Sequence, residues 1–140
     1  AVIDQLTVTV RMTKAQADAL VHACDLAYRV ASGHWRVVAG YAGTHNTEAS
    51  DECLEFGDVG RQIEIAKMAA FPRVSAGAHY GITSKCLDHD IVRLAAVGKQ
   101  IRRAMAFHRK PEGDPMNVSF DRTMNWQPEG EPLPEVEVKP

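Results

Sequence analysis

Residues 88–113, DHDIVRLAAVGKQIRRAMAFHRKPEG, decide the fold that this sequence predicts. Apolar side chains recur there at spacings of three and four, which places them along one side of a helix: Ile91, Leu94, Ala95, Gly98, Ile101 and Met105. Asp88 and Asp90 stand at the start, where the helix dipole favours acids. Pro111 lacks the N–H that a continuing helix needs. We therefore expect one long helix that ends before Pro111.

The other side of this predicted helix is basic, with Arg93, Lys99, Arg102, Arg103 and Arg109. Residues 85–110 carry seven basic and two acidic side chains, a net charge of +5, whereas residues 111–140 carry two basic and seven acidic ones, a net charge of -5. Two interpretations stay open: a solvated face neutralised by the acidic tail, or a site for an anionic ligand. The tail could dock on the helix within one chain or between subunits.

Composition restricts the class of protein. A chain of 140 residues predicts one domain, which we place at residues 1–127, followed by an extended acidic, proline-rich arm at residues 128–140. The net charge of -2 argues against bulk nucleic-acid binding, and no apolar run is long enough to span a bilayer. The start, AVIDQLTVTV, has no signal-peptide pattern. The three cysteines, Cys24, Cys53 and Cys86, cannot all form disulfides within one chain. We therefore expect reduced thiols in a cytoplasmic protein.

The N-terminal third predicts a strand followed by a helix. Apolar and polar residues alternate from Leu6 to Arg11, which is typical of a half-buried strand. Thr13 and Gln16 form a capping-box pattern, and Gly33 suits the end of the helix. Its apolar stripe consists of Ala17, Leu20, Val21, Cys24, Ala27, Tyr28 and Ala31.

The middle of the chain predicts another helix. Residues His34–Tyr41 keep no single period and indicate either a short strand or an irregular segment. A second helix, capped by Thr47 or Ser50, should end before Pro72. Its apolar stripe is Cys53, Phe56, Gly60, Ile63, Ala66, Met68 and Ala70. Residues 73–85 then form a loop rich in small residues.

The C-terminal part predicts short extended segments. Residues Asn117–Asp121 suit a short strand, and alternation of Val136 and Val138 suits an edge strand in the arm. The whole pattern predicts an α+β fold: three main helices, a short N-terminal strand, a small antiparallel sheet and an extended Pro-rich C-terminal arm. Because the arm could add onto a neighbouring strand, we expect a homo-oligomer, a dimer or a higher even-numbered assembly.

The loop and the second helix supply candidate ligand contacts. Tyr80 could stack on a base, and Thr83 and Ser84 could offer hydroxyl groups, although the loop could equally be a connector with one packed aromatic residue. Arg61 lies beside the second apolar stripe and needs a neutralising acid, Glu64 or Asp58, or an anionic ligand.

Catalytic and metal-binding patterns are weak. Cys86 and His89 have the spacing of a ligand pair, but a structural zinc site needs four ligands and no second pair occurs. Neither a nucleophile elbow nor a phosphate-binding loop is present. We expect no enzyme activity, no metal and no cofactor.

The order of motifs resembles a known family. TVTVRMTKAQADALVHACDLAYRVASG is followed by an Ala-Phe-Pro helix end, a Gly-Ile-x-Ser loop, IRRAMAFHRKPEG and GEPLPEVEV, and the match extends from Leu6 to Val138. In this order the chain is similar to the phage-encoded Thoeris anti-defence sponges. These sequester the cyclic ADP-ribose isomer by which Thoeris systems signal infection, and some also hold cyclic di- or trinucleotides.

The resemblance implies binding without turnover, by a homo-oligomer in the cytoplasm of an infected bacterial host, with pockets between protomers. Arginines would contact the phosphates, and an aromatic residue would contact the base. The resemblance thus assigns ligand contacts to Arg29, Arg61, Tyr80, Arg102 and Arg103. Arg109 of the basic face completes our candidate set. The chain differs from the family pattern at Tyr80, where we expect phenylalanine, and at Asp90, where we expect asparagine. These differences bear on which cyclic nucleotide is bound.

Two other functions remain possible on the sequence. The basic helix could bind a protein or nucleic-acid partner in a small phage accessory protein, although a tail with a net charge of -5 would repel a phosphate backbone. A small enzyme acting on nucleotides ranks last, because the sequence offers no nucleophile or metal centre.

Overall fold

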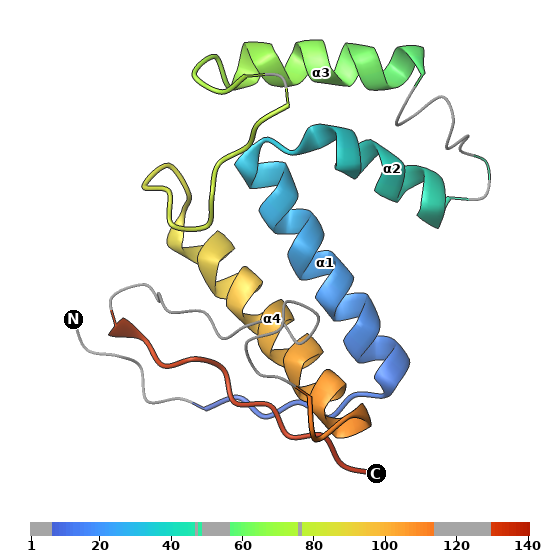
Figure 1. Ribbon diagram of the computed structural model, residues 1–140, viewed down its shortest axis with the longest axis vertical. Coiled ribbons are helices and arrows are strands. Elements are labelled where there is room, and N and C mark those ends of the chain that lie inside the picture. The colour runs from blue at the N-terminus through green and yellow to red at the C-terminus, as the bar shows by residue number, and fades with distance from the viewer. Residues whose placement is uncertain (1–6, 47, 49–56, 76, 114–129) are drawn as a thin grey trace. The chain divides into compact units, whose positions relative to one another are not determined.

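The computed structural model describes residues 7–46, 48, 57–75, 77–113 and 130–140, and these form four helices (Figure 1). They are α1 (Lys14–Ser32), α2 (Trp35–His45), α3 (Asp58–Ala70) and α4 (His89–Arg109). No strand occurs among the described residues. The prediction of an α+β fold with a small antiparallel sheet is therefore wrong, and the regular structure of the described part is helical.

The predicted N-terminal strand is absent from the described residues 7–12, which have no regular secondary structure and are exposed. Val8 is 76% and Val10 65% exposed. Alternation predicts which face a strand would bury, but a strand also needs a neighbour for its backbone groups, and the described chain supplies none. The arm at 130–140 likewise contains no strand. Leu6 and the predicted strand at 117–121 lie outside the described residues.

Helix α1 follows the sequence prediction closely. The Thr13 backbone N–H donates to Gln16 Oε1 at 2.8 Å, and the Gln16 backbone N–H donates to Thr13 Oγ1 at 3.2 Å, which completes the predicted capping box. Gly33 follows the helix with a φ of 84°, in the left-handed region that glycine adopts without strain. Both predicted helix ends are confirmed.

Residues 35–45 form helix α2, so neither a strand nor an irregular segment is correct for most of His34–Tyr41. Tertiary packing overrides the weak periodicity. The Trp35 indole N–H donates to the Val30 carbonyl oxygen at 2.9 Å, and its ring meets Phe71 edge-on with centroids 5.5 Å apart. Ala39 is buried in this helix, which packs against α3.

Helix α3 ends before Pro72 as predicted, with Phe71 as its C-cap. Its predicted start and the stripe residues Cys53 and Phe56 lie outside the described residues. The rest of the predicted stripe is partly wrong: Gly60 is buried, but Met68 is 48% exposed and Lys67 is 1% exposed. The buried position of a lysine has a specific cause, the backbone oxygens of the following loop.

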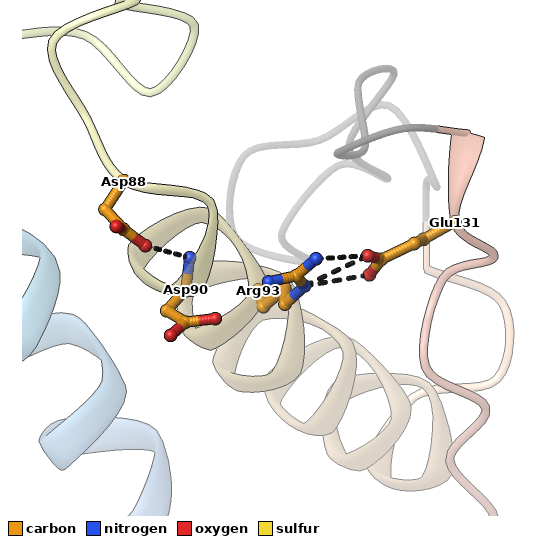
Figure 2. Close-up of polar contacts among 4 residues, drawn as sticks. All are labelled: Asp88, Asp90, Arg93 and Glu131. Carbon is orange, nitrogen blue, oxygen red and sulfur yellow. Dashed lines mark hydrogen bonds and ion pairs between the residues drawn. The ribbon is translucent and has the colours of Figure 1, made fainter. Parts of the chain in front are cut away.

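Helix α4 is confirmed as the longest helix of the described chain (His89–Arg109). Figure 2 shows its start, where the Asp90 backbone N–H donates to Asp88 Oδ1 at 2.7 Å. This is an aspartate N-cap, so the acids stand where both the dipole and the unpaired N–H groups favour them. The helix ends before Lys110, one residue ahead of Pro111.

The chain divides into two compact units. The first unit comprises the described residues of 1–25 and 92–140, and the second comprises those of 26–91. Helices α1 and α4 each contribute to both. The predicted division at residue 127 stays a prediction.

The first unit is built on an apolar contact between α1 and α4, which run alongside each other in Figure 1. Ala17 and Val21 of α1 pack against Ile101 of α4, flanked by Leu20, Val97 and Met105. The helices approach closely at Gly98, where an added Cβ would lie 2.9 Å from Cys24 Cβ. Leu94, which the sequence placed on this side of α4, is 38% exposed.

Candidate functional site

The eight predicted site residues are divided between the two units. The second unit contains Arg29, Arg61, Tyr80, Thr83 and Ser84, and the first contains Arg102, Arg103 and Arg109. Their convergence in one pocket stays a prediction, whereas the surroundings of individual residues within each unit are observed.

One cluster of cationic and imidazole side chains lies at the end of α1. Arg29 Nη1 is 2.9 Å from His34 Nδ1, and the His34 ring stacks on His79 with centroids 4.6 Å apart and planes within 2° of parallel. A guanidinium carries only donors, so this hydrogen bond makes His34 Nδ1 the acceptor and places the ring proton on Nε2. We call these three residues the Arg29 cluster; His79 is its exposed member.

The backbone of Tyr80 is tied to the same end of α1. The Tyr80 N–H donates to the Ser32 carbonyl oxygen at 2.9 Å, and the Tyr28 hydroxyl donates to the Tyr80 carbonyl oxygen at 3.0 Å. The Tyr80 ring is half-buried and meets Phe71 at an angle of 63°, with centroids 6.1 Å apart. Tyr80 is thus a packed aromatic residue whose backbone holds the loop beside the Arg29 cluster.

Lys67 fixes the part of the loop that precedes His79. Its side chain is 1% exposed, and Nζ donates to the carbonyl oxygens of Ser75 and Ala78, each at 2.6 Å. Burial of an ammonium group is costly unless such acceptors surround it. The loop therefore has a fixed course, because the same contacts that solvate Lys67 also hold the loop backbone.

The other predicted contacts of the second unit have local roles. Arg61 is exposed and pairs with Asp58, one of the two acids that the sequence suggested as its neutralising partner. Glu64, the other acid, lies 3.7 Å from Arg36 Nε. Ser84 Oγ accepts the Cys86 backbone N–H at 3.2 Å, which places this hydroxyl in a turn. Thr83 is exposed.

In the first unit, Arg103 lies over an aromatic ring. Its Cζ is 4.9 Å from the centroid of Phe107, one helical turn further along α4. A shallow hollow of about 210 Å³ adjoins this pair and is lined by Gln100, Arg103, Ala104, Phe107 and Val136. Four of these residues come from one face of α4 and the fifth from the C-terminal arm. Arg102 is half-buried and Arg109 exposed.

The C-terminal arm is attached to α4 by an ion pair (Figure 2). Arg93 Nε donates to both carboxylate oxygens of Glu131, at 3.1 and 3.0 Å, and Nη2 also donates to Oε1. The acidic arm thus contacts the basic helix within one chain. This is one of the two docking modes that the sequence allowed, the other being docking between subunits. A guanidinium and a carboxylate that share several hydrogen bonds also fix their relative orientation.

The sequence analysis did not select several residues of the hollow on α4 and of the Arg29 cluster. Gln100 and Phe107 were overlooked although Phe107 lies four residues after Arg103, a spacing that brings side chains together on a helix. His34 and His79 are far apart in the sequence, so no local spacing relates them, and only the course of the loop brings their rings together.

The described cysteines lie in different environments. Cys24 is 2% exposed, and burial raises the pKa of its thiol, while a backbone hydrogen bond from Gly98 acts in the opposite direction. Cys86 is exposed. Cys53 lies outside the described residues. Among the residues described, no three or more His, Cys, Asp or Glu side chains are grouped as metal ligands would be.

The described helices include none with the length and apolar character needed to cross a membrane. No family model, curated protein or solved structure matches the chain.

Proposed function

We propose that the protein is a phage anti-defence sponge, which binds a cyclic nucleotide immune signal and sequesters it without cleaving it. The observation that carries the proposal is the Arg29 cluster, where a guanidinium, two imidazoles and the fixed loop of Tyr80 lie together in one unit. The resemblance of the sequence to Thoeris anti-defence sponges gives the ligand class: a cyclic ADP-ribose isomer, a cyclic oligonucleotide, or both.

The chemistry of the Arg29 cluster suits a phosphate. A guanidinium remains charged at all physiological pH values and presents planar N–H donors that match phosphate oxygens. The imidazoles of His34 and His79 add ring N–H groups as donors. In this proposal Arg29 contacts a phosphate, and Tyr80 supplies an aromatic ring for a base.

Tight binding without turnover also needs a site whose shape is set before the ligand arrives. Two backbone hydrogen bonds hold Tyr80, and the Lys67 ammonium holds Ser75 and Ala78. The loop therefore loses little further conformational freedom on binding. Within this proposal the protein acts as a homo-oligomer in the cytoplasm of the infected host.

The test is a binding screen by calorimetry with a cyclic ADP-ribose isomer and with cyclic di- and trinucleotides. The bound ligand is then recovered after heat denaturation and identified by mass spectrometry. Recovery of intact ligand supports a sponge, and recovery of an altered ligand indicates an enzyme. If no cyclic nucleotide binds, the proposal fails, and a protein or nucleic-acid partner for the basic helix becomes the better hypothesis.

Arg29→Ala should weaken binding about tenfold to hundredfold, because loss of one charge-assisted phosphate contact costs roughly 1.5–3 kcal/mol. The matched control is Arg73→Ala, which removes an exposed arginine from the same unit and should leave affinity unchanged. Equal affinity of Arg29→Ala and the parent would remove Arg29 from the site.

A further inference from the structure

The hollow on α4 combines a planar cation, an aromatic ring and two apolar walls. Arg103 Cζ stands 4.9 Å from the centre of the Phe107 ring, Gln100 contributes an amide, and Ala104 and Val136 contribute methyl groups. Guanidinium groups stack on aromatic rings and on nucleobases alike, because both are flat and polarisable. An amide can donate to and accept from the edge of a base at once. Together, these groups suit a flat heteroaromatic ring.

The size of the hollow restricts the ligand to one ring system. Its volume of about 210 Å³ lies below the roughly 300–1,000 Å³ of pockets that enclose a whole drug-sized molecule. A complete cyclic dinucleotide is therefore too large to be enclosed. Only a part of a nucleotide, such as one ring system, could lie within it, with the sugar and phosphate outside.

Charge distinguishes the base from the phosphate as occupant. Glu135 and Glu137 flank Val136 in the arm that forms one wall of the hollow. Both carboxylates are exposed and Glu137 pairs with Lys139 at 3.4 Å, so they add only a weak preference for an uncharged base over an anion at that wall. Arg103 faces the same hollow and can stack without needing a phosphate as partner.

The wall formed by the arm has a defined attachment. Arg93 and Glu131 share several hydrogen bonds, with Nε at 3.1 and 3.0 Å from the two carboxylate oxygens. Glu131 precedes Val136 by five residues, so this ion pair limits how far Val136 can move from α4. The arm that forms this wall is therefore held against α4 by the Arg93–Glu131 ion pair as well as by the contact of Val136.

We propose that this hollow binds the base of a nucleotide, which stacks on the Arg103–Phe107 pair while Gln100 contacts its edge. The inference rests on the proposed function for its ligand class, but it assigns a site within the first unit of which the sequence indicated only Arg103. Phe107, not Tyr80, is the stacking residue at this site.

Adenosine 5′-monophosphate and guanosine 5′-monophosphate are suitable probes, with ribose 5-phosphate as the control that lacks a base. Binding is followed by calorimetry and by ligand-observed NMR of the base protons. Phe107→Leu, which keeps an apolar side chain and removes the ring, should weaken binding of a mononucleotide about fivefold to hundredfold. Arg103→Lys, which keeps the charge and removes the plane, should weaken it in the same direction. Lys110→Arg is the matched control, at an exposed position just after the same helix.

Circular dichroism must first show that each variant keeps the helical content and melting temperature of the parent. If well-folded Phe107→Leu and Arg103→Lys bind as the parent does, the hollow is not the base site, and this inference fails alone. The inference would also be overturned if ribose 5-phosphate competed as strongly as a mononucleotide. It would be overturned too if neither mononucleotide bound at millimolar concentration. Mononucleotide binding that depends on Phe107, in a protein that takes up no cyclic nucleotide, would support the inference and overturn the proposed function.

Discussion

The two units are stabilised by different kinds of interior. In the first unit, α1 and α4 meet through small apolar residues, with Ala17, Val21 and Gly98 at the contact. In the second unit, the fully buried side chains include Lys67 and Ser32, and the Lys67 ammonium and the Ser32 backbone carbonyl hold the loop that contains Tyr80. The first interior depends on shape and the second on satisfied polar groups.

This difference has an energetic consequence. A close apolar contact loses stability in proportion to the volume that is added or removed. A buried charge with its acceptors loses more when the charge is deleted, because each acceptor loses a charge-assisted hydrogen bond; here Ser75 would keep only the weaker one from the Ala78 backbone N–H among those observed. The second unit should therefore be the more sensitive of the two to a single substitution that keeps the side-chain volume.

The largest expected effect is that of Lys67→Met, which keeps an unbranched side chain of similar volume and removes the ammonium group with its three N–H donors. Ser75 and Ala78 would lose their ammonium donor, and we expect the free energy of unfolding to fall by about 3 kcal/mol. Chemical denaturation followed by circular dichroism measures the change. The control is Lys85→Met, at an exposed position of the same unit, which should change stability by less than about 0.5 kcal/mol.

Lys67→Met also separates stability from binding. Lys67 is not a proposed ligand contact, but it fixes the loop beside the Arg29 cluster. We therefore expect weaker cyclic nucleotide binding and faster hydrogen exchange in residues 77–80, even under conditions where the variant is folded. Unchanged stability and unchanged exchange would show that the second unit does not depend on its buried charge.

A smaller effect is expected for Gly98→Val in the first unit. The first added carbon would already lie 2.9 Å from Cys24 Cβ, so the helices must separate, at a cost of about 2 kcal/mol. Cys24→Gly should relieve part of this cost, since it removes the atom that is contacted. A double-mutant cycle measures the coupling. Strictly additive changes in the free energy of unfolding would mean that the two positions are not in contact.

The same contrast explains how far the sequence could predict the fold. The long helix α4, both ends of α1 and the end of α3 follow from capping residues, glycine and proline, which act within a few residues of their own position. The helix α2 and the exposed residues 7–12 were mispredicted, because packing on Phe71 and the lack of a neighbouring strand in the described chain are tertiary facts.

The candidate sites divide in a similar way. Arg29 and Tyr80 were selected from the sequence, and the structure places both at the end of α1. Their neighbours His34 and His79 were not selected, because the stack between them depends on a loop course that Lys67 determines. Phe107 could have been found, since its spacing from Arg103 is local. Polar interiors are thus harder to predict than helix faces.

The smallest expected effect is a pH dependence in the apolar contact of the first unit. Burial raises the pKa of Cys24 above its ordinary value of 9.0, whereas the thiol of the unfolded chain titrates near that value. The unfolded state therefore loses a proton first as the pH rises. It follows that the stabilising contribution is complete below pH 9 and is lost as the pH rises from there through the folded-state pKa. The free energy of unfolding should fall over this range, and Cys24→Ala should lessen the fall.

Alkylation tests the same point at one residue. Because only the thiolate reacts, native Cys24 should be modified by iodoacetamide at pH 8 far more slowly than exposed Cys86. Peptide mapping by mass spectrometry follows each cysteine separately, and denatured protein provides the control in which the difference should disappear. Equal rates in the native protein would mean that the α1–α4 contact opens readily at Gly98.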